Sequence, residues 1–194
     1  RFNSPVVMEK TKTKPQIFAR AGNVINLGTV EYEAAFDLQV ELRNERLAGN
    51  IPDTLVLLEH EPIITLGRSG NMQNVRVTQS RLDEEHIRLI HTNRGGDVTY
   101  HGPGQLIGYT IVDLNQYELD IKTHLRLLEE VVIQAINSFG VCGIRVPGLT
   151  GVWVGNEKIA SIGLHIKHWV TMHGFALNVQ PKLENFSLIY PCGI

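Results

Sequence analysis

The spacing of apolar residues predicts two helices that frame a block of shorter strands. Residues 30–47 and 121–136 each place apolar side chains three or four positions apart, which is typical of a helix with one buried face. Asp120 is a suitable N-cap for the second helix, whose stripe comprises Ile121, Leu125, Leu128, Val132 and Ile136. We predict that residues 26–29 form a turn with an N-cap before the first helix, which carries Tyr32, Ala35, Phe36, Leu42 and Leu47.

Five short runs rich in β-branched and apolar residues predict strands. They cover residues 54–58, 63–66, 151–154, 158–166 and 170–179. Gly155 and Asn156, between the third and fourth runs, are typical of a hairpin turn. Because these strands are interspersed with only two helices, the pattern indicates the α+β class, a single domain with a mixed or antiparallel sheet flanked by helices.

Composition places the chain among soluble globular proteins. Its 194 residues, 43% of them hydrophobic and 20% charged, suffice for one domain with a sizeable core. No apolar run reaches the roughly 18 residues of a membrane span, and a net charge of −2 does not favour nucleic-acid binding. We expect residues 16–194 to form the domain and residues 1–15 to be a flexible basic segment.

Residues 93–109 are the most unusual part of the sequence. They read NRGGDVTYHGPGQLIGY and combine closely spaced glycines with Arg94, Thr99, Tyr100, His101 and Gln105. Glycine lets the backbone adopt positive φ angles and approach a ligand closely, and polar loops of this kind more often carry function than packing. The P-loop and dinucleotide-binding fingerprints are absent, so the segment predicts a binding loop without specifying its ligand.

Five sequence blocks, in a fixed order and spacing, carry more specific information. They are LEHEP with TLGR at positions 58–68, RGGDVTYHGPGQ at 94–105, GNEKIASIG at 155–163, HGFALNV at 173–179 and PCGI at 191–194. On these blocks the chain resembles the lipoyl(octanoyl) transferases, which share a superfamily with lipoate ligases and biotin protein ligases. The resemblance runs from about residue 24 to the end and implies a biotin/lipoate protein ligase-like fold.

The resemblance assigns Cys192 as a nucleophile and Lys158 as its partner in a catalytic dyad. A thiol suits a thioester substrate, because attack yields another thioester of similar energy. Lys158 has two possible roles, as an ammonium that stabilises the thiolate or as a neutral general base, and we favour an ion pair in the resting state. We interpret Cys142, which follows the second helix, as a buried packing thiol.

By the same resemblance, three segments bind the substrate. They comprise Arg94, Gly95, Gly96, Asp97, Val98, Thr99, Tyr100 and His101, then Ser161, Ile162 and Gly163, and finally Gly174, Phe175 and Ala176. The apolar members offer a slot for an acyl chain, and Gly163 and Gly174 are expected to leave room for it. His101 is placed at the acyl site with a hydrogen-bonding or proton-transfer role, and His60 and Arg68 are assigned supporting roles. His165 and His168 lack further ligands at metal-site spacing, so we predict no metal and no cofactor.

The implied activity is octanoyl transfer with ping-pong kinetics. The octanoyl group would pass from octanoyl-acyl carrier protein to Cys192, and then to a lysine on lipoyl domains of 2-oxoacid dehydrogenase complexes or on glycine cleavage H protein. Three other classes stay open: an ATP-dependent lipoate or biotin-type ligase, a non-catalytic module that binds a carrier protein or lipoyl domain, and a thiol hydrolase, which would need water to outcompete the amine. We expect a monomer with no nucleic-acid or membrane partner, located in the cytoplasm, or in an organelle if the source is eukaryotic.

Two further expectations concern docking and the chain end. Acyl carrier proteins are acidic, so the candidates for docking are the basic residues Arg68, Arg76, Arg81, Arg88 and Arg94. The family pattern continues beyond Pro-Cys-Gly, whereas this sequence ends two residues after Cys192. We therefore expect the catalytic domain to lack its C-terminal end here.

Overall fold

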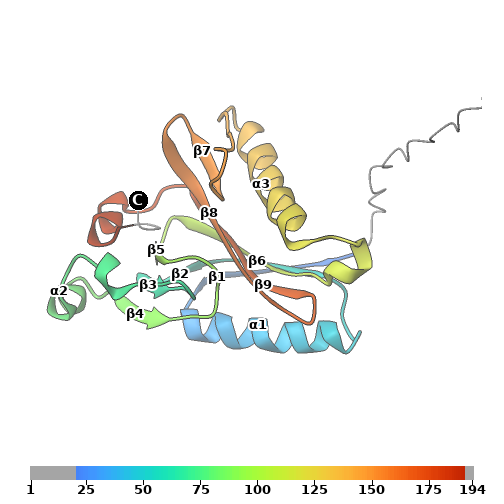
Figure 1. Ribbon diagram of the computed structural model, residues 1–194. Coiled ribbons are helices and arrows are strands. Elements are labelled where there is room, and N and C mark those ends of the chain that lie inside the picture. Colours follow the sequence, from blue (N-terminus) through green and yellow to red (C-terminus); the bar gives the residue numbers. More distant parts are fainter. Residues whose placement is uncertain (1–20, 191–194) are drawn as a thin grey trace, which may run out of the picture.

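The computed structural model describes residues 21–190, in which two sheets and three α-helices form one α+β unit (Figure 1). The helices are α1 (Tyr32–Leu47), α2 (Gln79–Glu84) and α3 (Ile121–Asn137). The strands are β1 (Asn23–Val30), β2 (Thr54–His60), β3 (Ile63–Leu66), β4 (Arg88–His91), β5 (Val98–His101), β6 (Gln105–Ile111), β7 (Val152–Val154), β8 (Glu157–Lys167) and β9 (Val170–Asn178).

Both sheets are mixed. The large sheet has the order β1-β2-β6-β9-β8-β7, in which β1 and β2 are parallel and the other neighbours are antiparallel. The small sheet has the order β4-β3-β5, with β4 parallel and β5 antiparallel to the central strand. The predicted α+β class with a mixed sheet flanked by helices is confirmed.

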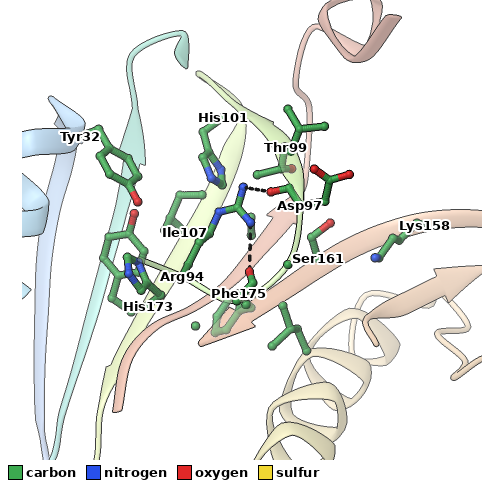
Figure 2. A pocket seen from close by; sticks show the side chains of 18 residues that line it. Tyr32, Arg94, Asp97, Thr99, His101, Ile107, Lys158, Ser161, His173 and Phe175 are labelled. Atoms are coloured by element: carbon green, nitrogen blue, oxygen red, sulfur yellow. Dashed lines mark hydrogen bonds between the residues drawn. The ribbon is translucent and has the colours of Figure 1, made fainter. Parts of the chain in front are cut away.

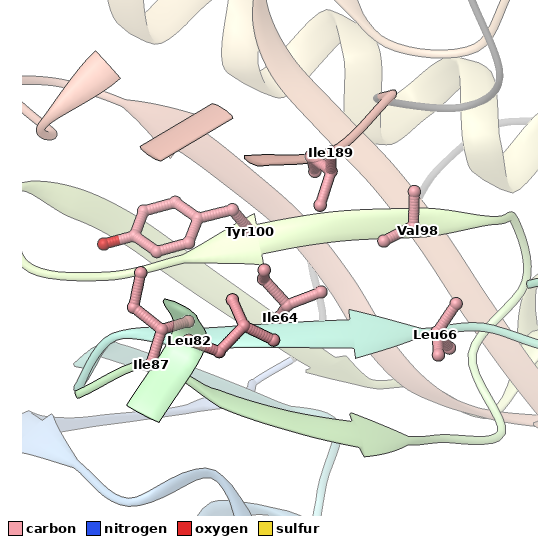
Figure 3. Close-up of a cluster of buried hydrophobic side chains, with 7 residues drawn as sticks. All are labelled: Ile64, Leu66, Leu82, Ile87, Val98, Tyr100 and Ile189. Atoms are coloured by element: carbon pink, nitrogen blue, oxygen red, sulfur yellow. The ribbon is translucent and has the colours of Figure 1, made fainter. Parts of the chain in front are cut away.

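The large sheet is covered on one face by α1 and on the other by α3 (Figure 1). Side chains alternate along β9, so Ala176 packs in the cluster under α1, while Phe175 and Leu177 pack in the cluster under α3. A separate core holds the small sheet together, and Figure 3 shows its residues Ile64, Leu66, Leu82, Ile87, Val98, Tyr100 and Ile189.

The first helix forms where the spacing predicts it, but its start and its inner face differ from the prediction. Residues 26–29 are not a turn: they lie within β1, where a register shift between Asn26 and Thr29 accommodates Gly28 at φ 66°. The inner face of α1 also buries polar side chains, while Leu47 is exposed. Some of their polar atoms have partners, since Gln39 accepts a hydrogen bond from the His173 amide at 2.7 Å and Arg46 pairs with Asp53, whereas Gln39 Nε2 and Arg43 Nε are buried without a hydrogen-bond partner among residues 21–190.

The second helix begins as predicted, because the Asp120 carboxylate accepts a hydrogen bond from the Thr123 amide at 2.6 Å. The glycine-rich segment is less loop-like than expected, since it contains β5 and most of β6, whose pairing partners come from distant parts of the chain. The strands β1 and β4 and the short helix α2 also lie outside the predicted elements.

The interpretation of Cys142 as a packing thiol is wrong. Its side chain is exposed, because the chain turns after α3 at Gly140 (φ 80°) and Val141 packs against the α3 core instead. Cys192 and the predicted basic segment 1–15 lie outside the described residues. Within residues 21–190, no helix is both long and apolar enough to cross a membrane.

Candidate active site

A narrow cavity lies where the glycine-rich segment crosses the large sheet (Figure 2). Its walls come from the loop 94–97, from β5, β6, β8 and β9, and from the first residue of α1. Every substrate-binding residue predicted from the sequence, except Tyr100, lines this cavity. Lys158 lies at one end of it and Tyr32 and His173 lie at the other. About 60 Å³ of free space remains inside, so any ligand must fit closely.

Four lining residues were missed by sequence reasoning, namely Tyr32, Ile107, Tyr109 and His173. Tyr32 was interpreted as part of the buried stripe of the first helix, and the two β6 residues resemble ordinary core positions. His173 had a usable signal, because it directly precedes the Gly174-Phe175-Ala176 motif.

The side chain of Tyr100 does not face the cavity, which corrects its assignment to substrate binding. Neighbouring side chains of a strand point to opposite faces, so Thr99 and His101 face the cavity while Tyr100 enters the small core. There its ring meets Phe186 edge-on, and its hydroxyl oxygen accepts a hydrogen bond from Asn185 at 2.7 Å.

The Arg94 side chain holds the loop 94–97 in place and is not part of the outer surface. Its buried guanidinium donates to the Thr65 carbonyl at 2.6 Å and to the Asp97 carbonyl at 2.8 Å (Figure 2 shows the second bond). The Arg94 guanidinium therefore connects both ends of the loop 94–97 to β3. At 8% exposure Arg94 cannot serve as a carrier-docking residue, which corrects that expectation.

The glycines Gly163 and Gly174 make room for backbone and not for an acyl chain. A Cβ on Gly163 would lie 2.8 Å from the Gly95 carbonyl oxygen, and one on Gly174 would collide with the Gly108 carbonyl. This close approach lets the Gly95 amide donate to the Leu164 carbonyl at 2.8 Å, which fixes the loop over β8. The expectation that these residues leave space for the ligand is therefore wrong.

His60 supports the cavity wall from behind. Its Nδ1 lies 2.8 Å from the Val30 carbonyl oxygen, which can only accept, so Nδ1 carries the proton and Nε2 accepts from the Tyr109 hydroxyl at 2.6 Å. Burial lowers the pKa of His60, so its ring is neutral at pH 7. His60 thereby fixes the position of a residue that lines the cavity.

His101 faces the cavity as a neutral imidazole. Gln105 donates to Asn178 and to the Tyr100 carbonyl, so its own oxygen accepts from His101 Nδ1 at 2.9 Å. Burial, together with the nearby His60 and Arg94, lowers the pKa of His101 to about 3. A group with that pKa is a poor base at pH 7, so hydrogen bonding suits His101 better than proton transfer.

His173 adopts a strained backbone conformation at the far end of the cavity, with φ 61° in the middle of β9. Two hydrogen bonds hold it there: Gln39 accepts from its amide at 2.7 Å, and its Nε2 lies 2.7 Å from Asn93 Oδ1. Burial, with Arg94 and His165 nearby, lowers the pKa of His173 to about 3.

Lys158 lies where the narrow cavity meets a wider cleft of about 700 Å³. Both spaces share Thr99, Lys158 and Ser161, and the cleft is bordered by the 3-10 helix Leu183–Leu188. The half-buried Lys158 lies with its Nζ 5.1 Å from the centre of the Trp153 ring. Its position between the two spaces suits a group that acts on a ligand spanning both.

The other predicted supporting and docking residues are spread over the surface. Arg68 is exposed, and it supports the loop through its backbone amide, which donates to the Arg94 carbonyl at 2.9 Å. Arg81 and Arg88 pair with nearby glutamates, and Arg76 stacks over Tyr190. Among residues 21–190, no three His, Cys, Asp or Glu side chains are arranged to hold a metal ion.

Comparison with known proteins defines first the class of protein and then the family. The family model of the lipoyl protein ligase A/B catalytic domain matches residues 31–194. The chain is 48% identical to the octanoyltransferase of Solibacter usitatus over 168 residues, covering 87% of this chain and 76% of that protein. It is 50% identical to the octanoyltransferase of Caldicellulosiruptor bescii over 174 residues, covering 89% and 76%. The chain belongs to the octanoyltransferases of the lipoyl protein ligase A/B catalytic-domain family.

Solved structures with the same fold include lipoate-protein ligases. A lipoate-protein ligase A bound with ATP superposes with a TM-score of 0.71 at 18% identity, covering 89% of this chain and 72% of that one. A bipartite lipoate protein ligase from Thermoplasma acidophilum gives a TM-score of 0.65 at 18% identity, covering 87% and 65%. At this level of identity the likeness concerns the fold alone.

Proposed function

We propose that this protein transfers an octanoyl group from octanoyl-acyl carrier protein to a lysine amine of lipoyl domains, through a thioester on Cys192. One observation carries the proposal: in a chain that belongs to the octanoyltransferases, the residues predicted to bind an acyl chain line a narrow cavity with Lys158 at its mouth. The acceptors are lipoyl domains of 2-oxoacid dehydrogenase complexes and glycine cleavage H protein.

The cavity walls suit an unbranched acyl chain. Ile107, Ile162, Phe175 and Ala176 provide apolar surface, and the slot is narrow. Burying the seven carbons beyond the carbonyl, six methylenes and a methyl, at about 0.8 kcal/mol each offers roughly 5–6 kcal/mol before ordering costs. That energy holds the chain in place while its carbonyl lies near Lys158.

The proposed nucleophile is Cys192, and the helix that precedes it in the chain supports its pairing with Lys158. Cys192 follows Tyr190 by two residues, and the Tyr190 amide donates to the Asn74 carbonyl at 2.8 Å. The preceding helix Leu183–Leu188 borders the cleft that contains Lys158, and a nearby ammonium favours the thiolate.

The reaction has two balanced steps. The Cys192 thiolate attacks the octanoyl carbonyl, the bond to the carrier thiol breaks, and that thiol leaves with a proton. The amine of the incoming lysine then attacks the new thioester, forming an amide and releasing the Cys192 sulfur. Lys158 exchanges the proton between amine and thiolate. Because the entering group is already a thioester, the reaction requires no ATP, metal or cofactor.

The nucleophile assignment is tested by intact mass spectrometry after incubation with octanoyl-acyl carrier protein. Wild-type protein and Cys142→Ala are each expected to gain one octanoyl group, because the exposed Cys142 lies outside the Pro-Cys-Gly motif. Cys192→Ala is expected to gain none. An octanoyl adduct on Cys192→Ala would overturn the thioester mechanism. A requirement for ATP and free octanoate would identify a ligase instead.

The role of Lys158 is tested by Lys158→Arg. Arginine keeps the charge but cannot act as a base. Acylation close to the wild-type rate would exclude an obligatory base role, and loss of acylation with retained folding would support proton exchange through Lys158.

A further inference from the structure

The end of the cavity opposite Lys158 is closed by a thin wall, and an outer groove lies beyond it. This groove, of about 480 Å³, is lined by Phe36, Ile90, Thr92 and Asn93 among others. Tyr32 lines both spaces and is 4% exposed. The Tyr32 ring therefore separates the cavity from the groove.

Two hydrogen bonds hold the wall closed. The Tyr32 hydroxyl lies 2.9 Å from Thr92 Oγ1, and His173 Nε2 lies 2.7 Å from Asn93 Oδ1. In each pair one residue lines the cavity and the other lines the groove. Displacing either ring would leave buried polar atoms without partners, so the wall resists being pushed outward. The strained backbone of His173 is likewise held by the Gln39 side chain.

We propose that this wall, made of Tyr32, His173, Thr92 and Asn93, sets the length of the acyl chain that the protein accepts. The inference rests on the proposed function, which places the reacting carbonyl near Lys158. An extended chain with its carbonyl at that end points its methyl end toward Tyr32 and His173 (Figure 2). Longer chains meet the hydrogen-bonded rings of the wall and are excluded.

The wall also predicts what happens when it is opened. Removing the Tyr32 ring joins the cavity to the groove, where Phe36 and Ile90 offer apolar surface to the excess methylenes. A tight pocket discriminates by roughly ten-fold or more for each misfitting methylene. We therefore expect Tyr32→Ala to raise the ratio of tetradecanoyl to octanoyl transfer at least ten-fold.

The experiment is a competition between octanoyl- and tetradecanoyl-acyl carrier protein for one lipoyl-domain acceptor, with products resolved by intact mass. Ile90→Ala is the matched control, since it removes an apolar side chain that lines the outer groove and not the cavity. Tyr32→Phe keeps the ring but loses the hydrogen bond to Thr92, so it is expected to raise the ratio less than Tyr32→Leu does. The Ile90→Ala control is expected to change the ratio less than two-fold. Tyr32→Leu, which loses less packing volume, is expected to shift the ratio several-fold and carries the test if Tyr32→Ala does not fold.

The outcomes separate this inference from the function on which it rests. A raised ratio in Tyr32→Ala or Tyr32→Leu, with an unchanged ratio in Ile90→Ala, supports the wall as the length limit. An unchanged ratio in a folded Tyr32→Leu, while wild-type protein transfers octanoyl groups, overturns the inference alone. Failure of the wild-type protein to transfer octanoyl groups overturns the proposed function as well.

Discussion

Mild acid is expected to destabilise the protein strongly, because several imidazoles are buried in the neutral form. His101 and His173 line the cavity, and His124 lies on the inner face of α3. Burial lowers the pKa to about 3 for His101, about 3 for His173 and about 4 for His124. Unfolding returns each ring to water, where the pKa of histidine is about 6.5.

The sign and size of the effect follow from proton linkage. Well above pH 6.5 these rings are neutral in both states and contribute nothing to the pH dependence. As the pH falls through 6.5, the unfolded chain binds protons that the folded protein rejects, so stability falls. From pH 6.5 to pH 5 each ring costs about 1.6 kcal/mol, and the three together cost about 5 kcal/mol. The lowered pKa of His60 adds to this loss. A domain is typically stable by only about 5–15 kcal/mol, so this loss is large.

Urea denaturation at pH 7, 6 and 5 at constant ionic strength measures the effect. The slope near pH 5 is expected to be about 4 kcal/mol per pH unit, which corresponds to uptake of about three protons. His124 lies away from the cavity, and His124→Gln is expected to lower the proton uptake on unfolding by about one proton. A loss below about 2 kcal/mol between pH 6.5 and pH 5 would refute the assignment of neutral buried rings.

Three substitutions test the contacts that hold the site. Arg94→Lys replaces the guanidinium that connects the loop to β3 and is expected to cost about 2–3 kcal/mol, seen as a fall of roughly 5–10 °C in Tm. Glu129 of α3 is fully buried, accepts a hydrogen bond from the Gly151 amide at 3.0 Å and pairs with Arg126 and Arg145. Glu129→Ala is expected to cost about 3 kcal/mol, against less than about 1 kcal/mol for Arg145→Ala, whose side chain is more exposed. Tyr109→Phe leaves His60 Nε2 without its donor and is expected to cost about 1–3 kcal/mol in urea denaturation, and an unchanged midpoint would contradict that role.

The sequence predicts most of the regular elements because their signals are local. The apolar spacing locates both long helices, and the Asp120 cap and the Gly155-Asn156 turn are where the sequence predicts them. The elements that were missed depend on distant partners. The β1 strand is irregular and exposed along most of its length, and it is specified by pairing with β2 rather than by alternation of its own side chains.

The candidate site shows the same difference between local signals, which the sequence reveals, and long-range contacts, which it does not. Contiguous motifs identify most of the cavity residues, because each motif covers one stretch of loop or strand. Tyr32 escapes such reasoning, since nothing in a helical stripe distinguishes a core tyrosine from one that closes a cavity. The side-chain directions also escape it: Tyr100 and the glycines at 163 and 174 belong to the right segments, but their contacts serve packing.

The arrangement of the two spaces is consistent with the covalent intermediate of the proposed function. The narrow cavity meets the wider cleft at Lys158, so in that proposal the donor and the acceptor reach the acyl group through one mouth. We therefore expect the donor to leave before the acceptor arrives, with the octanoyl group held meanwhile as the thioester proposed on Cys192. A thioester keeps the acyl group activated without ATP. The solved ligases share the fold alone, so we expect the difference in chemistry to lie at the mouth of the cavity rather than in the architecture.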